Sequence, residues 1–85
     1  MLYDVSLANR DCIFDEASGL CFEDALSFAS GRGGVYVVHI LHHGATEAGV
    51  SLGYDSDTDT FKAQDMWGEW TVVNAEQIRT MLSGQ

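Results

Sequence analysis

The longest apolar run of the chain lies at residues 33–44 and is bounded by glycines on both sides. Most of its positions carry β-branched or aromatic side chains, which fit the pleated surface of a strand. Successive side chains of a strand face opposite ways, and here both faces are apolar for most of the length. The run therefore predicts a central strand, buried in the middle of a sheet with a covering layer on each side.

Alternation also marks the N-terminal part of the chain. Residues 2–7 alternate apolar with polar side chains, as a half-buried strand does. Residues 12–14 predict a short second strand that closes a hairpin. The acidic residues 15–19 predict a loop after that strand.

The second half of the chain predicts further hairpins. Residues 48–54 and 60–66 alternate, and they flank the segment 55–59, whose Asp, Ser and Thr side chains favour a turn. A second tight turn is predicted at residues 67–70. A short last strand is predicted at residues 71–73.

Two segments have the apolar spacing of amphipathic helices. The first has Cys21 near its N-cap position, with Ser18 as the nearest good capping residue. The second begins at Asn74, which forms a capping-box pattern with Gln77, and it ends at Gly84. The predicted buried stripes consist of Phe22, Ala25, Leu26 and Ala29 in the first helix and of Ile78, Met81 and Leu82 in the second.

These elements follow one another in the order β-β-α-β-β-β-(β)-α. Sequential hairpins imply antiparallel pairing, and amphipathic helices need a sheet face to cover. The sequence therefore predicts one α+β domain over residues 1–85, with an antiparallel sheet of about five strands and two helices packed on it.

The charge of the chain restricts its partners. Thirteen acidic residues stand against four Lys and Arg, which gives a net charge of −9. Direct binding of DNA or RNA needs the opposite sign to neutralise phosphates, and an anionic membrane surface repels such a chain as well. A basic protein surface attracts it, and the groove of a nucleic-acid-binding protein is the commonest surface of that kind.

Cys12 and Cys21 are too few for a disulfide framework. No segment has the pattern of a signal peptide or the length of a membrane span. We therefore expect a cytoplasmic protein with reduced thiols, in which both cysteines are small buried hydrophobic residues.

His39, His42 and His43 are the first candidates for a metal site. On a strand, His39 and His43 share a face but lie about 13 Å apart, while His42 points the other way. The acidic segment 55–59 has the start of a calcium loop, but Thr and Met stand at the sixth and twelfth positions, where such a loop needs Gly and Glu. No signature of nucleophilic catalysis is present either, so we expect no metal, no cofactor and no enzymatic activity.

The acidic residues fall into two groups along the sequence. In an extended chain, Asp55, Asp57 and Asp59 would line one face about 6.6 Å apart, similar to the spacing of phosphates along a nucleic-acid strand. The candidate partner-binding residues are Asp55, Asp57, Asp59, Asp65, Trp67 and Glu69 in the C-terminal group and Asp11, Asp15, Glu16, Glu23 and Asp24 in the N-terminal group.

Trp67 and Trp70 interleave with the acids of the C-terminal group. We expect them to cap the core beneath the last helix. An exposed tryptophan at this place would instead anchor an interface, because tryptophan is enriched at binding hot spots.

With 85 residues, one predicted α+β domain, strong negative charge and no motif, the chain resembles the small acidic inhibitors encoded by phages and mobile elements, particularly anti-CRISPR proteins and other DNA mimics. The resemblance rests on these whole-chain traits and transfers no residue role. It implies a non-catalytic inhibitor in the cytoplasm of a bacterial host cell. Its carboxylates would occupy a Lys/Arg groove of a Cas surveillance complex or of another nucleic-acid-binding protein.

A small structural or regulatory interaction module is the alternative. Such a module needs no nucleic-acid mimicry, and it would homodimerise through an edge strand or through the surface of Trp67 and Trp70. Carboxylates that converge on one face favour the inhibitor, and scattered carboxylates favour the module.

Overall fold

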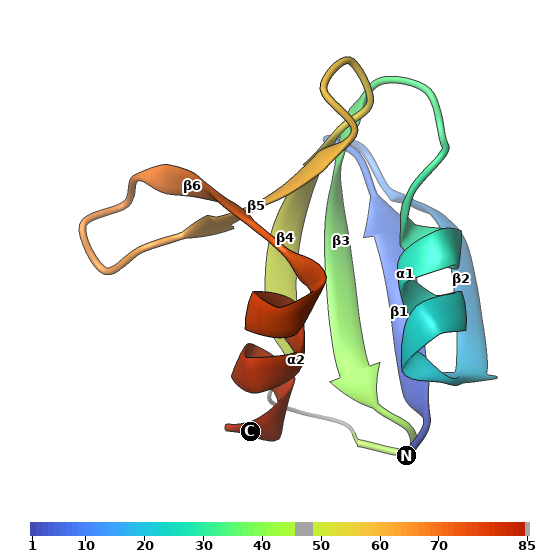
Figure 1. Ribbon diagram of the computed structural model, residues 1–85. Helices are drawn as coiled ribbons and strands as arrows, with labels where there is room; N and C mark the ends of the chain where they lie inside the picture. The colour runs from blue at the N-terminus through green and yellow to red at the C-terminus, as the bar shows by residue number, and fades with distance from the viewer. Residues whose placement is uncertain (46–48, 85) are drawn as a thin grey trace.

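The apolar run at residues 33–44 forms β3 (Val35–His42), which lies inside a six-stranded antiparallel sheet of order β2-β1-β3-β4-β5-β6 (Figure 1). The computed structural model describes residues 1–45 and 49–84. Since β3 pairs with β1 on one side and with β4 on the other, its predicted central position is confirmed. The other elements are β1 (Tyr3–Ala8), β2 (Ile13–Leu20), α1 (Phe22–Ala29), β4 (Val50–Asp55), β5 (Thr60–Gln64), β6 (Trp70–Val73) and α2 (Ala75–Ser83).

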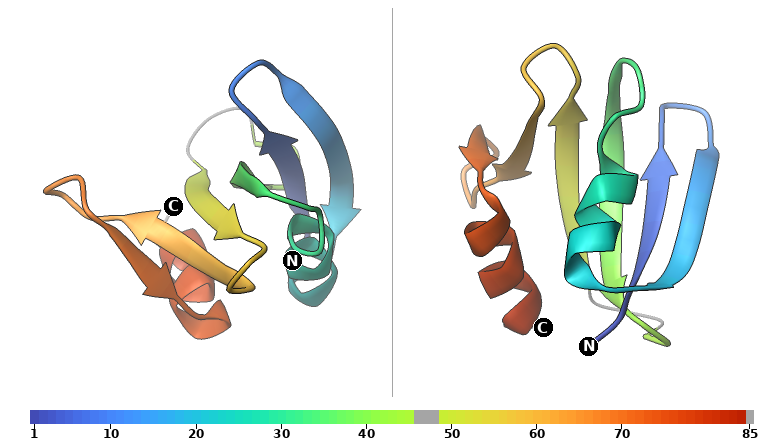
Figure 2. Two further views of the ribbon diagram at one scale, coloured as in Figure 1. Left: turned by 90° about the horizontal axis from the view of Figure 1, so that it is seen from above. Right: turned by 45° about the vertical axis from the view of Figure 1, so that its right-hand side comes forward.

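Both helices lie on the same face of the sheet (Figure 2). α1 packs on β1 and β2, and α2 packs on β4. The α+β class, the antiparallel sheet and the two packed helices are therefore confirmed. The sheet has six strands where about five were predicted, because the short last run pairs with β5.

The core lies between the helices and the strand positions that face them. Alternate residues of β1 and β3 are buried, because successive strand side chains face opposite ways. Leu26 and Met81 of the predicted helical stripes are half-buried, and the other stripe residues are buried. The largest fully buried side chains are Val5, Leu7, Val38, Ile40, Leu52, Ile78 and Leu82.

The opposite face of the sheet, called the open face below, carries no helix of the described residues. Val35 and Val37 of β3 are 72% and 45% exposed there. The prediction of a covering layer on both sides is therefore wrong. Two helices of eight and nine residues bury one face, and the apolar side chains of the second face stay in solvent.

The acidic segment after residue 14 is a strand and not the predicted loop. Asp15 pairs with Leu7, and Glu16 pairs with Ser6, within β2. β2 is an edge strand whose side chains are mostly exposed, so it lacks the apolar alternation that identifies a strand in a sequence. Its pairing with β1 in the β1–β2 hairpin holds it in place, so the predicted hairpin is confirmed and its second strand is longer than predicted.

Helix α1 begins without a side-chain cap. The predicted cap, Ser18, lies within β2, and Cys21 stands at the N-cap with no capping hydrogen bond from its side chain. The first turn carries Glu23 and Asp24, whose negative charge is favourable at the positive end of the helix dipole.

The hairpins of the second half are confirmed with shifted ends. β4 starts at Val50 in the described residues, and Ala48, the predicted start, lies outside them. β5 ends at Gln64, because the following residues form the next turn.

The capping box of α2 is confirmed. The Asn74 side chain accepts the backbone N–H of Gln77 at 2.8 Å, and the Gln77 side chain accepts the backbone N–H of Asn74 at 2.8 Å. Both contacts are local in sequence, which is why residue type and spacing were enough to predict them.

The hydroxyl of Tyr36 fixes the connection between α1 and β3. It donates to the carbonyl oxygen of Ala29 at 2.8 Å and accepts the backbone N–H of Arg32 at 3.3 Å. Burial raises the pKa of Tyr36, so the hydroxyl keeps the proton that it donates. One side chain thus satisfies a helix-end carbonyl and orders the following loop.

We expect Tyr36→Phe to lower the free energy of unfolding by roughly 1–3 kcal/mol, because the buried Ala29 carbonyl loses its partner. Urea denaturation measures this loss. Tyr3→Phe is the matched control, since the Tyr3 ring is also buried but its hydroxyl has no hydrogen bond to any described residue. A loss at Tyr36 no larger than that at Tyr3 would contradict the proposed role.

Candidate protein-binding surfaces

The carboxylates between β4 and β5 form a turn and not an extended row. The Oδ1 atom of Asp55 accepts the backbone N–H of Asp57 at 3.0 Å. Asp59 has a positive φ of 51° and accepts a hydrogen bond from the hydroxyl of Tyr54, and this bond raises the pKa of Tyr54. The predicted spacing of about 6.6 Å along one face is therefore wrong. Of the three, Asp57 alone has a carboxylate without a hydrogen bond to another described residue.

The β5–β6 turn is held by its own hydrogen bonds. The Oδ1 atom of Asp65 accepts the backbone N–H groups of Trp67 and Glu69, both at 2.9 Å. Gly68 adopts a φ of 85°, and the Gln64 side-chain amide donates to the Gly68 carbonyl at 3.0 Å. Asp65 is therefore a turn-forming residue, and Glu69 is an exposed acid of this turn.

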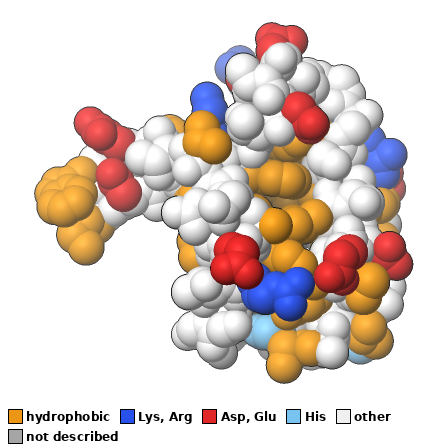
Figure 3. All heavy atoms as spheres, in the orientation of Figure 1, with side chains coloured by type: hydrophobic (Ala, Val, Ile, Leu, Met, Phe, Trp, Pro, Cys, Tyr) orange, Lys and Arg blue, Asp and Glu red, His pale blue; other side chains and the backbone are white. Residues whose placement is uncertain are grey.

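The β5–β6 hairpin projects from the rest of the molecule and has hydrophobic and acidic side chains at its tip (Figures 1 and 3). Met66 is 86% exposed and Trp67 is 81% exposed. Trp70 is half-exposed on the open face, where its Cζ3 atom lies 3.6 Å from the place that a Cβ of Gly53 would take. The prediction that the tryptophans cap the core beneath α2 is wrong, because the hairpin directs them away from that helix.

The N-terminal acids do not form one cluster. Asp15 pairs with Arg32 at 3.0 Å. Glu23 pairs at 3.5 Å with Arg79, whose guanidinium also lies 4.4 Å from the ring centroid of Phe22. The other three acids of this group are exposed and lie on separate elements, namely Asp11 in the β1–β2 turn, Glu16 on β2 and Asp24 on α1. The candidate acids are therefore dispersed over the surface.

The histidines lie on β3 and directly after it, whereas the cysteines lie in the β1–β2 turn and at the start of α1. His42 Nε2 is 2.9 Å from the carbonyl oxygen of Leu82, and its ring packs against Tyr3. Cys12 and Cys21 are exposed beside a turn and at a helix N-cap, so the prediction that they are buried is wrong. Among residues 1–45 and 49–84, no three His, Cys, Asp or Glu side chains are grouped as metal ligands would be.

A row of residues across the open face was not predicted from the sequence. It takes one residue from each strand, and directly opposed residues share a face of the sheet. In sheet order the row is Ile13, Ala8, Val37, Gly53, Lys62 and Val72. The middle of this row forms the floor of a groove of about 480 Å³.

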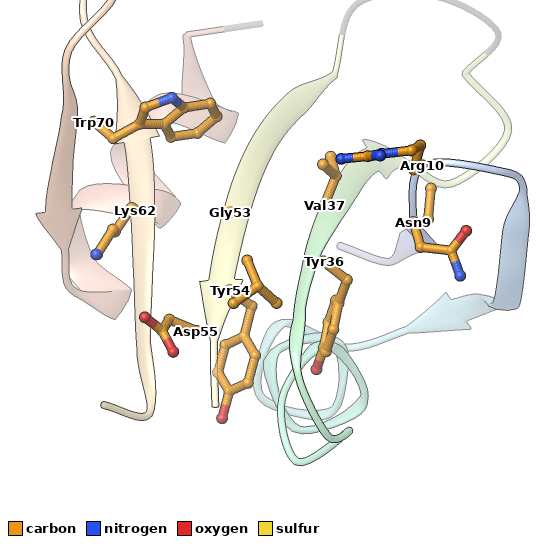
Figure 4. Close-up of a pocket in the computed structure, with 11 residues that line it drawn as sticks. Asn9, Arg10, Tyr36, Val37, Gly53, Tyr54, Asp55, Lys62 and Trp70 are labelled. Atoms are coloured by element: carbon orange, nitrogen blue, oxygen red, sulfur yellow. The ribbon is translucent and has the colours of Figure 1, made fainter. Parts of the chain in front are cut away.

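Figure 4 shows the arrangement of the groove. Trp70 and Arg10 stand on opposite sides, with Val37 and Gly53 between them, and Lys62 lies on the side of Trp70. Two features of the sequence could have indicated this groove. The second face of β3 is apolar, and a glycine inside a strand often marks the close approach of another group.

Comparison of the chain with protein-family models, with characterised proteins and with solved structures found no match. Within the described residues, no helix combines the length and the apolar character that crossing a membrane requires. Function is therefore inferred from the geometry of the chain itself.

Asp4 joins three segments near the N-terminal end of β1. Its Oδ1 atom lies 2.8 Å from His43 Nδ1 and accepts the backbone N–H of Gly19 at 3.1 Å, while Oδ2 accepts that of Gly44 at 3.3 Å. The hydrogen bond from His43, assisted by those backbone donors, holds the pKa of Asp4 below its ordinary value of 3.8. A lowered carboxyl pKa adds stability above the ordinary pKa, and this stability is lost as the pH falls through the folded pKa.

We expect Asp4→Asn to lower the free energy of unfolding at neutral pH. The difference from the wild type should shrink as the pH falls from 3.8 through the lower pKa of the folded state, because the folded carboxylate becomes protonated there. Urea denaturation over a pH series measures the effect. Ser6→Ala, on the same strand and face, changes no titrating group and should give a constant difference; a constant difference for Asp4→Asn would show that the ionised carboxylate contributes nothing.

Proposed function

We propose that this protein is a non-catalytic inhibitor that binds a basic, nucleic-acid-binding surface of another protein. The observation that supports the proposal is the projecting β5–β6 hairpin, which holds Met66 and Trp67 in solvent beside Glu69. Exposed aromatic side chains of this kind become hot spots when a partner pocket desolvates them. The net charge of −9 selects a pocket surrounded by Lys and Arg.

The hairpin is preorganised for such a contact. The hydrogen bonds of Asp65 fix the backbone at Trp67 and Glu69 before any partner arrives. Binding then requires little further ordering of the loop, which preserves more of the contact energy as affinity.

The proposed contact differs from an imitation of a phosphate row, because the carboxylates do not converge on one face. Trp67 enters an apolar pocket, Glu69 pairs with a cation at the rim, and the remaining charge accelerates the encounter. Occupation of the groove then excludes the nucleic acid. A Cas complex is a candidate partner on the basis of the resemblance to anti-CRISPR inhibitors, and any nucleic-acid-binding protein with this surface fits equally well.

A second candidate function, a homodimeric interaction module, is favoured by the dispersal of the carboxylates over the surface and by one further observation. Val35, Val37 and Val72 leave an apolar open face, and contiguous apolar surface of this kind marks interaction sites. Sedimentation over a concentration series separates the two functions. A tight dimer that protects Trp67 and Trp70 from a fluorescence quencher supports the module, and a monomer supports the inhibitor.

We expect the acidic protein, used as bait, to capture a host protein, and we expect that host protein to release its nucleic acid when the two proteins bind. The measurement is a pull-down from the native host with mass spectrometry, followed by affinity measurement at several salt concentrations. Trp67→Ala should weaken binding by a factor of about 30, the loss typical of a hot-spot residue. We expect this substitution to have little effect on folding, because the Trp67 side chain lies outside the core.

Three charge-reversal variants separate long-range electrostatic steering from a direct contact between Glu69 and a cation of the partner. Glu69→Lys, Asp57→Lys and Glu16→Lys each change the net charge of −9 by two units, at three separate places of the surface. Long-range steering affects all three alike, whereas a contact at the hairpin makes Glu69→Lys the most damaging. Reversal at Asp55 or Asp59 is avoided because both carboxylates hold the turn. Equal affinity for all variants, or a partner that retains its nucleic acid, would rule the proposal out.

A further inference from the structure

The four basic side chains of the protein divide into two kinds. Arg32 and Arg79 form ion pairs with carboxylates. Arg10 and Lys62 form none with a described carboxylate, and both line the groove on the open face (Figure 4). In a chain of net charge −9, these two cations thus line the same groove, from opposite sides.

One acid, Asp55, also lines the groove. Its Oδ1 atom is already engaged by the backbone N–H of Asp57 at 3.0 Å, so part of its hydrogen-bonding capacity serves the β4–β5 turn. The charged residues that line the groove, Arg10, Lys62 and Asp55, therefore have a summed formal charge of +1. This is the reverse of the molecule as a whole.

The uncharged part of the groove is apolar and partly aromatic. Val37 and Gly53 form the floor, and Trp70 forms one wall. Because Gly53 has no side chain, the indole of Trp70 can lie against β4. Its Cζ3 atom is 3.6 Å from the position that a Cβ atom at residue 53 would occupy. The groove volume of about 480 Å³ lies within the range of small-molecule sites.

We propose that this groove binds a small organic anion with a planar aromatic body, such as an aromatic carboxylate. The guanidinium of Arg10 matches a carboxylate in a two-pronged geometry, and Lys62 adds positive charge from the opposite side. The aromatic body packs on Val37 and against the indole of Trp70. This site is separate from the hairpin tip, so the proposal does not depend on the proposed function.

The test uses naphthoate as the probe and naphthalenemethanol as its uncharged match. Titration of each compound is followed in amide NMR spectra of the full chain. We expect naphthoate to shift the amides of Val37 and Gly53, and to bind about tenfold more tightly than the alcohol, because only the anion forms charge-assisted hydrogen bonds.

Matched variants locate the charge requirement. Arg10→Gln and Ser27→Glu each make the net charge more negative by one unit, but Ser27 is an exposed residue of α1, on the helix-covered side of the sheet. Arg10→Gln should weaken naphthoate binding about tenfold and bring it to the affinity of the alcohol. Ser27→Glu should leave it unchanged.

A second pair of variants tests the shape of the groove. Gly53→Leu places a side chain on the floor, whereas Ser51→Leu places the same side chain on the same strand and face, outside the lining residues. Binding should be lost in the first and retained in the second. Because Arg10 is exposed, we expect Arg10→Gln to fold normally. The Arg10→Gln measurement therefore still tests the proposal if Gly53→Leu does not fold.

Three results would overturn the proposal. The first is equal binding of naphthoate and the alcohol, and the second is naphthoate binding that Arg10→Gln leaves unchanged. The third is a concentration-dependent dimer whose formation shifts the amide signals of Val37 and Gly53 without ligand, since the groove would then belong to a second copy of the chain.

Discussion

The pairing of β3 with β1 and β4 decides which side chains this protein buries and which it offers to other molecules. Its register places Val38 and Ile40 under the helices and leaves Val35 and Val37 on the open face. A slip of one residue would exchange the two sets, because side chains alternate along a strand. Since both short helices of the described residues lie on one face of the sheet, the other face stays uncovered, and the open-face groove follows from the way the core is formed.

The parts of the fold that were predictable depend on neighbours in sequence. The capping box of Asn74 and Gln77 needs only two residues three apart, and the alternation of β1 is visible within six residues. The hairpin of β1 and β2 was predicted, but β2 was predicted too short, because its side chains after residue 14 are mostly exposed and show no apolar alternation. The tryptophans were misplaced for a related reason: residue type suggests burial, but the direction of the β5–β6 hairpin decides it, and no local pattern encodes that direction.

The candidate acids illustrate why charge in a sequence overstates charge available for binding. A carboxylate that accepts backbone N–H groups, as Asp65 and Asp55 do, stabilises a turn and has fewer free lone pairs. Asp15 and Glu23 are partly neutralised by Arg32 and Arg79. The net charge still directs long-range encounter, which depends on the whole field of the molecule. Close contact depends on individual groups, and these are fewer than the composition implies.

The hairpin shows how the same chain separates stability from binding. Phe61 and Val73, at its base, pack against the core on the helix-covered face. At the tip, Asp65 and Gly68 fix the turn through local hydrogen bonds and backbone conformation. The segment between base and tip is therefore ordered without burying Trp67 or Met66. Folding has already met the entropic cost of ordering the backbone of this turn, so a partner that covers these side chains gains apolar burial with a smaller opposing loss.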